Sequence, residues 1–417
     1  MESIDGRLLL VASVPSTLWA FYRRLPEFAT AAGIKVAVAS SAGAELDIFR
    51  KELGLDTFAV AMPRRISPLT DLRSVGQLAK IMRRERFQIV HAMSPKGGLV
   101  GMLAARRARV PHRVYSMLGL PAETARGLMR RVLIATERLT CGCAHRVLAC
   151  SASLAREAEA LGIVAPSTVG VLGDGTSCGV DLRRFTRTAE VAEAGRAKRR
   201  ALGIPDDGRV IGFVGRLVRD KGIDATVEAF ERLAVNDAAL HLLLLGDYEP
   251  SRGEVRPETV RLIAAHPRIH HVPFDWEPVP YYAAMDLLIL ATHREGFPYA
   301  LLEAAAMELP VVATRATGCV DAVVDGQTGI LVPVGDVAAL ADGMRRVAED
   351  AALRRRFGRA ARERVERCFR DERLLQLHVD LYRELLGLRR QDAPEVESQK
   401  AGVSPGLPSS KAETEQA

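Results

Sequence analysis

Two glutamates eight residues apart, Glu295 and Glu303, flank a short apolar run in REGFPYALLEAAAMELPVVAT, residues 294–314. The apolar run Leu287–Ala291 predicts a strand before them, and Pro298 is typical of the first turn of a helix. Glu295 then lies in the turn, and Glu303 lies about a turn and a half into the helix. Both carboxylates could line one ligand, since carboxylate oxygens accept hydrogen bonds from sugar hydroxyls and a helix start attracts phosphate. Two solvent-facing acids are the alternative.

Two cations follow another predicted strand in FVGRLVRDKG, residues 213–222. Arg216 lies at the strand end, and Lys221 lies five residues later at the start of the next predicted helix. Together they could hold a diphosphate, and Gly215 lets the backbone come close to such a group. Ordinary loop charges are the alternative.

The elements that would position these residues are short apolar runs that alternate with longer amphipathic stretches. This pattern is typical of parallel sheets covered by helices. Candidate strands in the first half are Leu8–Ser13, Lys35–Ala39, Thr57–Ala61, Ile89–Ala92, His112–Ser116, Arg146–Cys150 and Thr168–Leu172. Candidates in the second half are Val210–Val214, His241–Leu245, Ile269–Pro273, Leu287–Ala291 and Pro310–Thr314. The sequence predicts an α/β protein with two doubly wound domains, whose facing strand ends would line an interdomain cleft.

A chain of 417 residues is long enough for two domains. We expect an N-terminal acceptor-side domain over 1–187, a linker with a charged helix over 188–207, and a C-terminal donor domain over 208–372. A helix over 373–388 would pack back on the first domain. The polar segment 389–417 has almost no large apolar residue and would be a disordered tail.

Charge is distributed unevenly along the chain. Residues 1–186 contain 26 Lys and Arg against 15 Asp and Glu, a net charge of +11, so the remainder carries −4 of the total of +7. In TARGLMRRVLIATERL, residues 124–139, basic and apolar residues alternate at helical spacing, which favours a helix lying on an anionic membrane. The alternative is a core helix with arginines at its rim.

Several classes of protein are disfavoured. No apolar run approaches the roughly 18 residues of a membrane span, and the first residues lack the features of a signal peptide. Aromatic residues make up only 5% and no RNA-binding motif occurs, so nucleic acid is not an expected partner. The six cysteines form no C-x-x-C pair and no set with zinc-ligand spacing. We expect free cysteines, mostly in the core, of a protein in a reducing compartment.

The segment EGFPYALLEA, residues 295–304, with LPVVAT, GCVDAV and DGQTGILVPVGD after it, resembles the retaining family-4 glycosyltransferases of the GT-B fold. Its motifs are closest to those of enzymes that extend polyprenyl-diphosphate-linked saccharides. The similarity includes GRLVRDKG and VHAMSPKGGLVGMLAA and extends over residues 6–388. It implies that Glu295 contacts the donor sugar, that Glu303 contacts the nucleotide ribose, and that Arg216 and Lys221 contact the diphosphate.

The resemblance also defines the remainder of the donor site. The residues expected to complete it are Gly215, Gly296, Phe297, Tyr299 and Phe274. No metal and no other cofactor is expected, and the chain has no Asp-x-Asp triplet that would bind a metal-bound diphosphate. The nucleotide sugar is then a co-substrate, and protein cations supply the electrostatic stabilisation.

The first domain departs from the family pattern at three places. SVPSTLWAF, residues 13–21, replaces a glycine-rich loop, Leu118 stands where many members have histidine, and Cys178 stands where many have asparagine. The missing histidine removes one expected contact with the donor sugar.

Three residues of this domain are candidates for the acceptor side. His91 could substitute for the missing histidine, and a buried structural histidine is the alternative. Lys96 opposes the dipole of a predicted helix, which an acceptor phosphate beside it would resolve. Ser13 lies in the loop after the first strand.

The leading hypothesis is a metal-independent hexosyl- or N-acetylhexosaminyltransferase that uses a UDP sugar, with GDP-mannose as the next candidate donor. Its acceptor would be a lipid-linked saccharide or glycan in surface polysaccharide or glycolipid biosynthesis. The protein would be cytoplasmic and peripheral on the inner face of the cytoplasmic membrane. Two alternatives stay open: a GT-B transferase with a soluble small-molecule acceptor, and a degenerate nucleotide-sugar-binding protein, prompted by Leu118 and Cys178.

Overall fold

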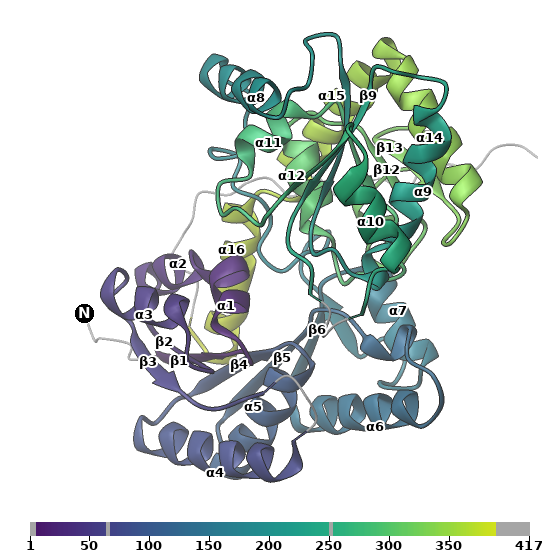
Figure 1. Cartoon of the computed structure of the whole chain (residues 1–417). Coiled ribbons are helices and arrows are strands. Elements are labelled where there is room, and N and C mark those ends of the chain that lie inside the picture. The colour runs from purple at the N-terminus through teal and green to yellow at the C-terminus, as the bar shows by residue number, and fades with distance from the viewer. Residues whose placement is uncertain (1–5, 64–66, 250–252, 389–417) are drawn as a thin grey trace, which may run out of the picture.

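The computed structural model describes residues 6–63, 67–249 and 253–388, which form two α/β domains (Figure 1). The tail expected over 389–417 lies outside the described residues. Within the described ranges, no helix is both long enough and apolar enough to cross a bilayer.

A seven-stranded parallel sheet forms the first domain, in the order β3-β2-β1-β4-β5-β6-β7. Leu8 of β1 is aligned with Val36 of β2 on one side and with Ile89 of β4 on the other. The strands are β1 Gly6–Val11, β2 Ile34–Ser40, β3 Asp56–Ala59, β4 Ile89–Met93, β5 His112–Met117, β6 Arg146–Ala149 and β7 Val169–Val171.

Helices cover both faces of this sheet, which explains why the Leu8–Val11 part of β1 is apolar without interruption (Figure 1). Leu8 and Leu10 pack into one core, whereas Leu9 and Val11 pack into the other. One face carries α1 Pro15–Tyr22, α2 Leu25–Ala31 and α3 Ala44–Lys51, and the other carries α4 Pro68–Arg84, α5 Pro95–Ala108 and α6 Gly127–Cys143. The short helix η1 is Pro121–Glu123, and α7 is Ala152–Ala160.

A six-stranded parallel sheet forms the second domain, in the order β10-β9-β8-β11-β12-β13. Its strands are β8 Arg209–Val214, β9 Leu240–Leu245, β10 Ile269–Val272, β11 Leu287–Leu290, β12 Val311–Thr314 and β13 Gly329–Val332. The sequence did not predict β13, because it has only four residues and begins with glycine, which is depleted in strands. The two doubly wound sheets confirm the predicted α/β fold class.

The helices of the second domain lie between these strands and, for the last two, after β13. They are η2 Arg219–Lys221, α9 Ile223–Ala234, α10 Pro257–Ala265, α11 Val279–Ala284, α12 Tyr299–Ala306, α13 Cys319–Ala322, α14 Val337–Glu349 and α15 Ala351–Cys368. The segment expected to be a linker contains a further helix, α8 Ala189–Ala201. Lys198 of α8 donates to the Tyr281 hydroxyl of α11 at 2.9 Å, and Arg199 pairs with Asp286 at 2.8 Å. These contacts make α8 part of the second domain rather than a free connection.

The last helix, α16 Asp371–Leu385, returns the chain to the first domain (Figure 1). Leu375, Val379 and Tyr382 pack into the core that contains Leu8 of β1. Arg24 at the start of α2 forms an ion pair with Asp371. The helix therefore fastens the two domains together.

Candidate active site

Loops at the carboxyl ends of the second sheet bring Glu295 and Lys221 together. Glu295 lies between β11 and α12, Lys221 lies in η2 after β8, and their side chains form an ion pair. The pair is largely enclosed, since the Glu295 side chain is 11% exposed and the Lys221 side chain is 20% exposed. The sequence predicted these two residues as neighbours of one ligand, and the structure places them in direct contact.

The backbone around Glu295 is held by both domains. The Glu295 N–H donates to the Thr317 carbonyl of its own domain at 3.1 Å, and the Gly296 carbonyl accepts from the Ser151 hydroxyl of the first domain at 2.8 Å. A Cβ atom at Gly296 would overlap the Leu118 carbonyl and lie 2.8 Å from the Cys150 sulfur. Only glycine therefore fits where the two domains meet, and Leu118 lies directly at this contact.

Arg216 lies at the end of β8, where Gly215 has a φ of 147° that favours glycine. Its guanidinium pairs with Glu249 at 2.9 Å and is partly exposed. A cation at this strand end is placed as the sequence predicted, but its partner in the structure is Glu249.

Glu303 lies within α12 and accepts a hydrogen bond from the buried Tyr282 hydroxyl at 2.6 Å. Burial raises the pKa of the Glu303 carboxyl, although the Tyr282 hydrogen bond opposes this shift. The carboxyl is thus enclosed and has a protein partner, which meets part of the cost of burying it.

Two residues expected in the donor site, Tyr299 and Phe297, have their partners at the domain boundary. The Tyr299 hydroxyl accepts from the backbone N–H groups of Ser177 at 3.1 Å and Cys178 at 3.0 Å. Phe297 is buried and packs edge-on against Phe369, with ring centroids 5.3 Å apart. These partners come from the first domain and from the segment before α16, which the sequence pattern could not place.

Phe274 follows β10 and stays exposed, as a donor contact would require. Its ring lies edge-on to that of Trp276, with centroids 4.9 Å apart, and its backbone N–H donates to Asp247 at 3.1 Å.

The acceptor-side candidates are occupied by protein partners. His91 is fully buried, with one ring nitrogen 2.6 Å from the Tyr382 hydroxyl and the other 2.6 Å from the Ser116 hydroxyl. Burial holds the pKa of His91 well below its ordinary value. His91 is therefore a structural histidine and cannot replace the missing one.

Lys96 and Ser13 are likewise explained by local structure. Lys96 pairs with Asp71 of α4 at 2.6 Å, so a carboxylate rather than an acceptor phosphate offsets its conflict with the dipole of α5. Ser13 is buried, and a Cβ atom at Gly97 would lie 2.7 Å from its backbone nitrogen, because the start of α5 comes this close to the loop.

The sequence analysis missed a set of polar residues that join the domains beside Glu295. The Ser151 hydroxyl caps α7 by accepting from Leu154 N–H at 3.1 Å. The Ser153 N–H donates to Asp321 at 3.1 Å, and its hydroxyl accepts from Gly318 N–H at 2.7 Å. In ACSAS, residues 149–153, a serine precedes a run with helical apolar periodicity. Such a serine predicts the start of a helix, but it does not predict a hydrogen-bond partner in another domain.

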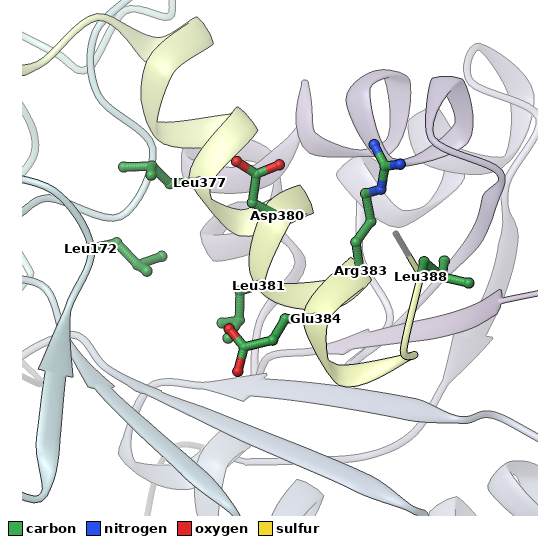
Figure 2. A pocket seen from close by; sticks show the side chains of 7 residues that line it. All are labelled: Leu172, Leu377, Asp380, Leu381, Arg383, Glu384 and Leu388. Atoms are coloured by element: carbon green, nitrogen blue, oxygen red, sulfur yellow. The ribbon is translucent and has the colours of Figure 1, made fainter. Parts of the chain in front are cut away.

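Two shallow hollows lie away from these residues. Figure 2 shows the first, of about 340 Å³, along α16, lined by Leu172, Leu377, Asp380, Leu381, Arg383, Glu384 and Leu388. The second, of about 350 Å³, is lined by Arg187, Met285, Asp286, Glu308, Leu309, Pro310, Ala351, Arg354, Arg355 and Arg359. Neither contains a predicted donor residue. Among the described residues, no group of three His, Cys, Asp or Glu side chains is arranged to hold a metal ion.

Comparison with known proteins defines the class. Residues 18–175 match a family described as glycosyl transferase 4-like domain, and residues 195–364 match one described as glycosyl transferases group 1. The fold is similar to that of sucrose-phosphate synthase from Thermosynechococcus elongatus, with a TM-score of 0.77 and 21% identity over 92% of this chain and 100% of that one. It is also similar to Anabaena Alr3699/HepE in complex with UDP and glucose, with a TM-score of 0.75 and 19% identity over 90% and 99% of the two chains. The fold is thus GT-B.

Curated relatives give the same class. The capsular polysaccharide biosynthesis glycosyltransferase CapM of Staphylococcus aureus is 30% identical over 86% of this chain and 92% of its own length. A D-inositol 3-phosphate glycosyltransferase of Saccharomonospora viridis is 31% identical over 76% of each chain. The chain therefore belongs to the GT-B glycosyltransferases.

Proposed function

We propose that this transferase moves a hexose or N-acetylhexosamine from a UDP sugar to a lipid-linked saccharide or glycan, in the biosynthesis of a surface polysaccharide or glycolipid. The Lys221–Glu295 ion pair carries the proposal. It sets an ammonium suited to a diphosphate oxygen beside a carboxylate suited to a sugar hydroxyl. The UDP and glucose in the Anabaena structure support the donor, and the name of the S. aureus relative supports the pathway class.

The reaction would be metal-independent and would retain the anomeric configuration. The bond from the anomeric carbon to the diphosphate breaks, and a bond from that carbon to the acceptor oxygen forms. Lys221, Arg216 and the N-terminus of α12 stabilise the charge that grows on the leaving diphosphate. The acceptor proton passes to a leaving phosphate oxygen on the same face of the sugar. Glu295 holds the sugar and Glu303 holds the ribose.

Calorimetric titration with UDP and GDP, in buffer containing EDTA, tests the donor site. Wild type should bind UDP, and Lys221→Ala should weaken binding about tenfold or more, because a charge-assisted hydrogen bond is lost. Arg219→Ala removes an exposed cation two residues away and should bind as wild type does. Failure of the wild type to bind either nucleotide, with or without divalent metal, would contradict the proposal.

The membrane part of the proposal rests on α6. The apolar residues along one side of α6 face solvent: Leu128 is 76% exposed, Val132 36% and Leu139 47%. The alternative of a core helix, in which these residues would be buried, is therefore wrong. Arg130 and Arg131 are exposed beside these residues and suit anionic lipid headgroups. We propose that this face rests on the inner side of the cytoplasmic membrane and brings a lipid-linked acceptor to the donor domain.

A soluble acceptor is the second candidate function. The names of the S. viridis relative and of the T. elongatus structure point to small phosphorylated acceptors. In that case vesicles would have no effect on turnover, and a small sugar or cyclitol phosphate would serve as acceptor.

A further inference from the structure

A short segment of the first domain, residues 118–124, touches the Glu295 loop from two sides. The Leu118 carbonyl lies against Gly296, and the Thr124 hydroxyl accepts from Arg294 at 2.9 Å. Between these contacts lies Glu123, at the end of η1. Neither the sequence motifs nor the donor site described above assigns it a role.

Glu123 reaches the second domain with one oxygen only. Its Oε2 accepts from the Thr317 hydroxyl at 2.7 Å. Thr317 in turn receives the Glu295 N–H on its backbone carbonyl. The other oxygen, Oε1, is buried and has no hydrogen-bond partner within the described structure. An enclosed oxygen without a partner is costly, and the cost is larger for a charged carboxylate than for a neutral carboxyl.

We propose that Glu123 is a positioning residue, whose carboxyl holds Thr317 and thereby orients the Glu295 loop against the first domain. The inference rests on the proposed function in one respect, that Glu295 is the residue that meets the donor sugar. Glu123 itself need not touch the substrate. Its contribution is to fix the backbone that carries the glutamate, because a small displacement of a positioned group lowers the rate.

The electrostatic surroundings of Glu123 make its contact with Thr317 depend on pH. The charged groups facing Glu123 are Glu157 of α7 and Arg294 and Glu295 of the loop after β11. Burial raises the pKa of Glu123 to about 7, the Thr317 hydrogen bond and Arg294 oppose the shift, and Glu157 and Glu295 add to it. Burial is the largest cause, so the enclosed position of the Glu123 carboxyl favours its protonated form, whereas the hydrogen bond from Thr317 favours the ionised form. The enclosed position of Glu123 is therefore most stable below the ordinary carboxyl pKa of 4.5 and loses stability as the pH rises from there to about 7.

Kinetics of four variants between pH 5.5 and 8.5 test the inference. Glu123→Ala and Thr317→Val should lower kcat about five- to tenfold at acid pH with little change in donor KM, since each removes one buried hydrogen bond. Thr317→Ser should restore the rate. Glu123→Gln keeps an acceptor and cannot ionise, so its rate relative to wild type should rise between pH 5.5 and about 7 and level off above that. Wild-type rates in Glu123→Ala, or a ratio of Glu123→Gln to wild type that is constant with pH, would overturn the inference.

Amide hydrogen exchange separates this inference from the proposed function. The Glu295 N–H should exchange faster in Glu123→Ala and in Thr317→Val than in wild type, and at the wild-type rate in Glu123→Gln at pH 6. If wild type transfers no sugar, the proposed function fails while exchange still decides whether the link exists. If wild type transfers sugar and exchange at Glu295 is unchanged in every variant, only the role of Glu123 fails.

Discussion

At the scale of single residues, the account depends on a lysine and a glutamate that share one enclosed position. Removing one charge of such a pair leaves the other partly buried and unpaired, which is unfavourable in addition to the lost function. We therefore expect the loss of either residue to disturb this position even before a ligand binds. Substitutions of Lys221 or Glu295 should therefore lower activity more than substitutions of exposed charged residues nearby.

Lys221→Ala and Arg216→Ala should each lower kcat/KM on the order of 10²–10³, because each removes a cation from a leaving group whose charge grows in the transition state. Arg219→Ala, which removes an exposed cation of the same short helix η2, serves as the matched control and should stay within about twofold of wild type. Steady-state kinetics with a saturating acceptor measure these values. Equal losses in all three variants would show a general charge effect and not specific diphosphate contacts.

The two glutamates should give different kinetic signatures. Glu303→Gln should raise the donor KM and also lower turnover, because the ribose contact acts on binding. Glu295→Gln should mainly lower kcat, because its contact lies beside the reacting carbon. The comparison needs donor KM and kcat for both variants and thermal unfolding midpoints as a control for folding. Unchanged kinetics in both variants would remove these residues from the donor site.

Several residue assignments could be predicted from the sequence, and others could not. The positions of Glu295, Lys221 and Arg216 could be predicted because each follows an apolar strand closely in sequence, and strand ends of a parallel sheet meet at one edge. The partners of His91 and Tyr299 could not be predicted, because Tyr382 and the Ser177–Cys178 backbone are far away in sequence and belong to other elements. Long-range hydrogen bonds of this kind leave no local pattern.

At the scale of elements, the loop between β11 and α12 is pressed against the loop after β5. Gly296→Ala should force these loops apart, since its Cβ would overlap the Leu118 carbonyl. We expect activity to fall by at least tenfold and stability by about 1–3 kcal/mol. Gly142→Ala in α6 has open space around its Cβ and should be neutral or slightly stabilising. Activity assays and thermal unfolding of both variants check the difference, and a fully active Gly296→Ala would contradict the close approach.

The α6 face gives the second prediction at this scale. Arg126, Arg130 and Arg131 changed together to Glu should abolish flotation with anionic vesicles, since each arginine contributes about 1 kcal/mol near such a surface and binding should weaken with salt. Activity on a lipid-linked acceptor should fall together with vesicle binding, while UDP binding stays intact.

A matched variant changes three exposed arginines of α15 in the second domain, namely Arg355, Arg356 and Arg359, to Glu. This control makes the same change in net charge and should still float. Undiminished flotation of the α6 variant would exclude α6 as the docking surface, and loss in both variants would indicate nonspecific charge attraction.

At the scale of the whole molecule, the two-domain architecture followed from the alternation of apolar runs. Of the thirteen strands in the part of the chain that the structure describes, twelve were predicted within a few residues. The position of α8 on the second domain and the depth to which α16 enters the first core did not follow from periodicity. Both depend on packing between segments that the sequence separates widely. The contact between Gly296 and Leu118 likewise exists only because both domains are present.

The central claim is that this chain transfers a sugar from a nucleotide donor without metal. Incubation of the wild type with radiolabelled UDP and GDP sugars, EDTA, and either a polyprenyl-diphosphate-linked saccharide or small phosphorylated acceptors tests it most directly. The account predicts transfer from a UDP-hexose or UDP-N-acetylhexosamine to the lipid-linked acceptor, undiminished by EDTA and lost in Lys221→Ala. Activity that disappears on chelation, or binding of nucleotide sugar with neither transfer nor hydrolysis of any donor, would contradict it.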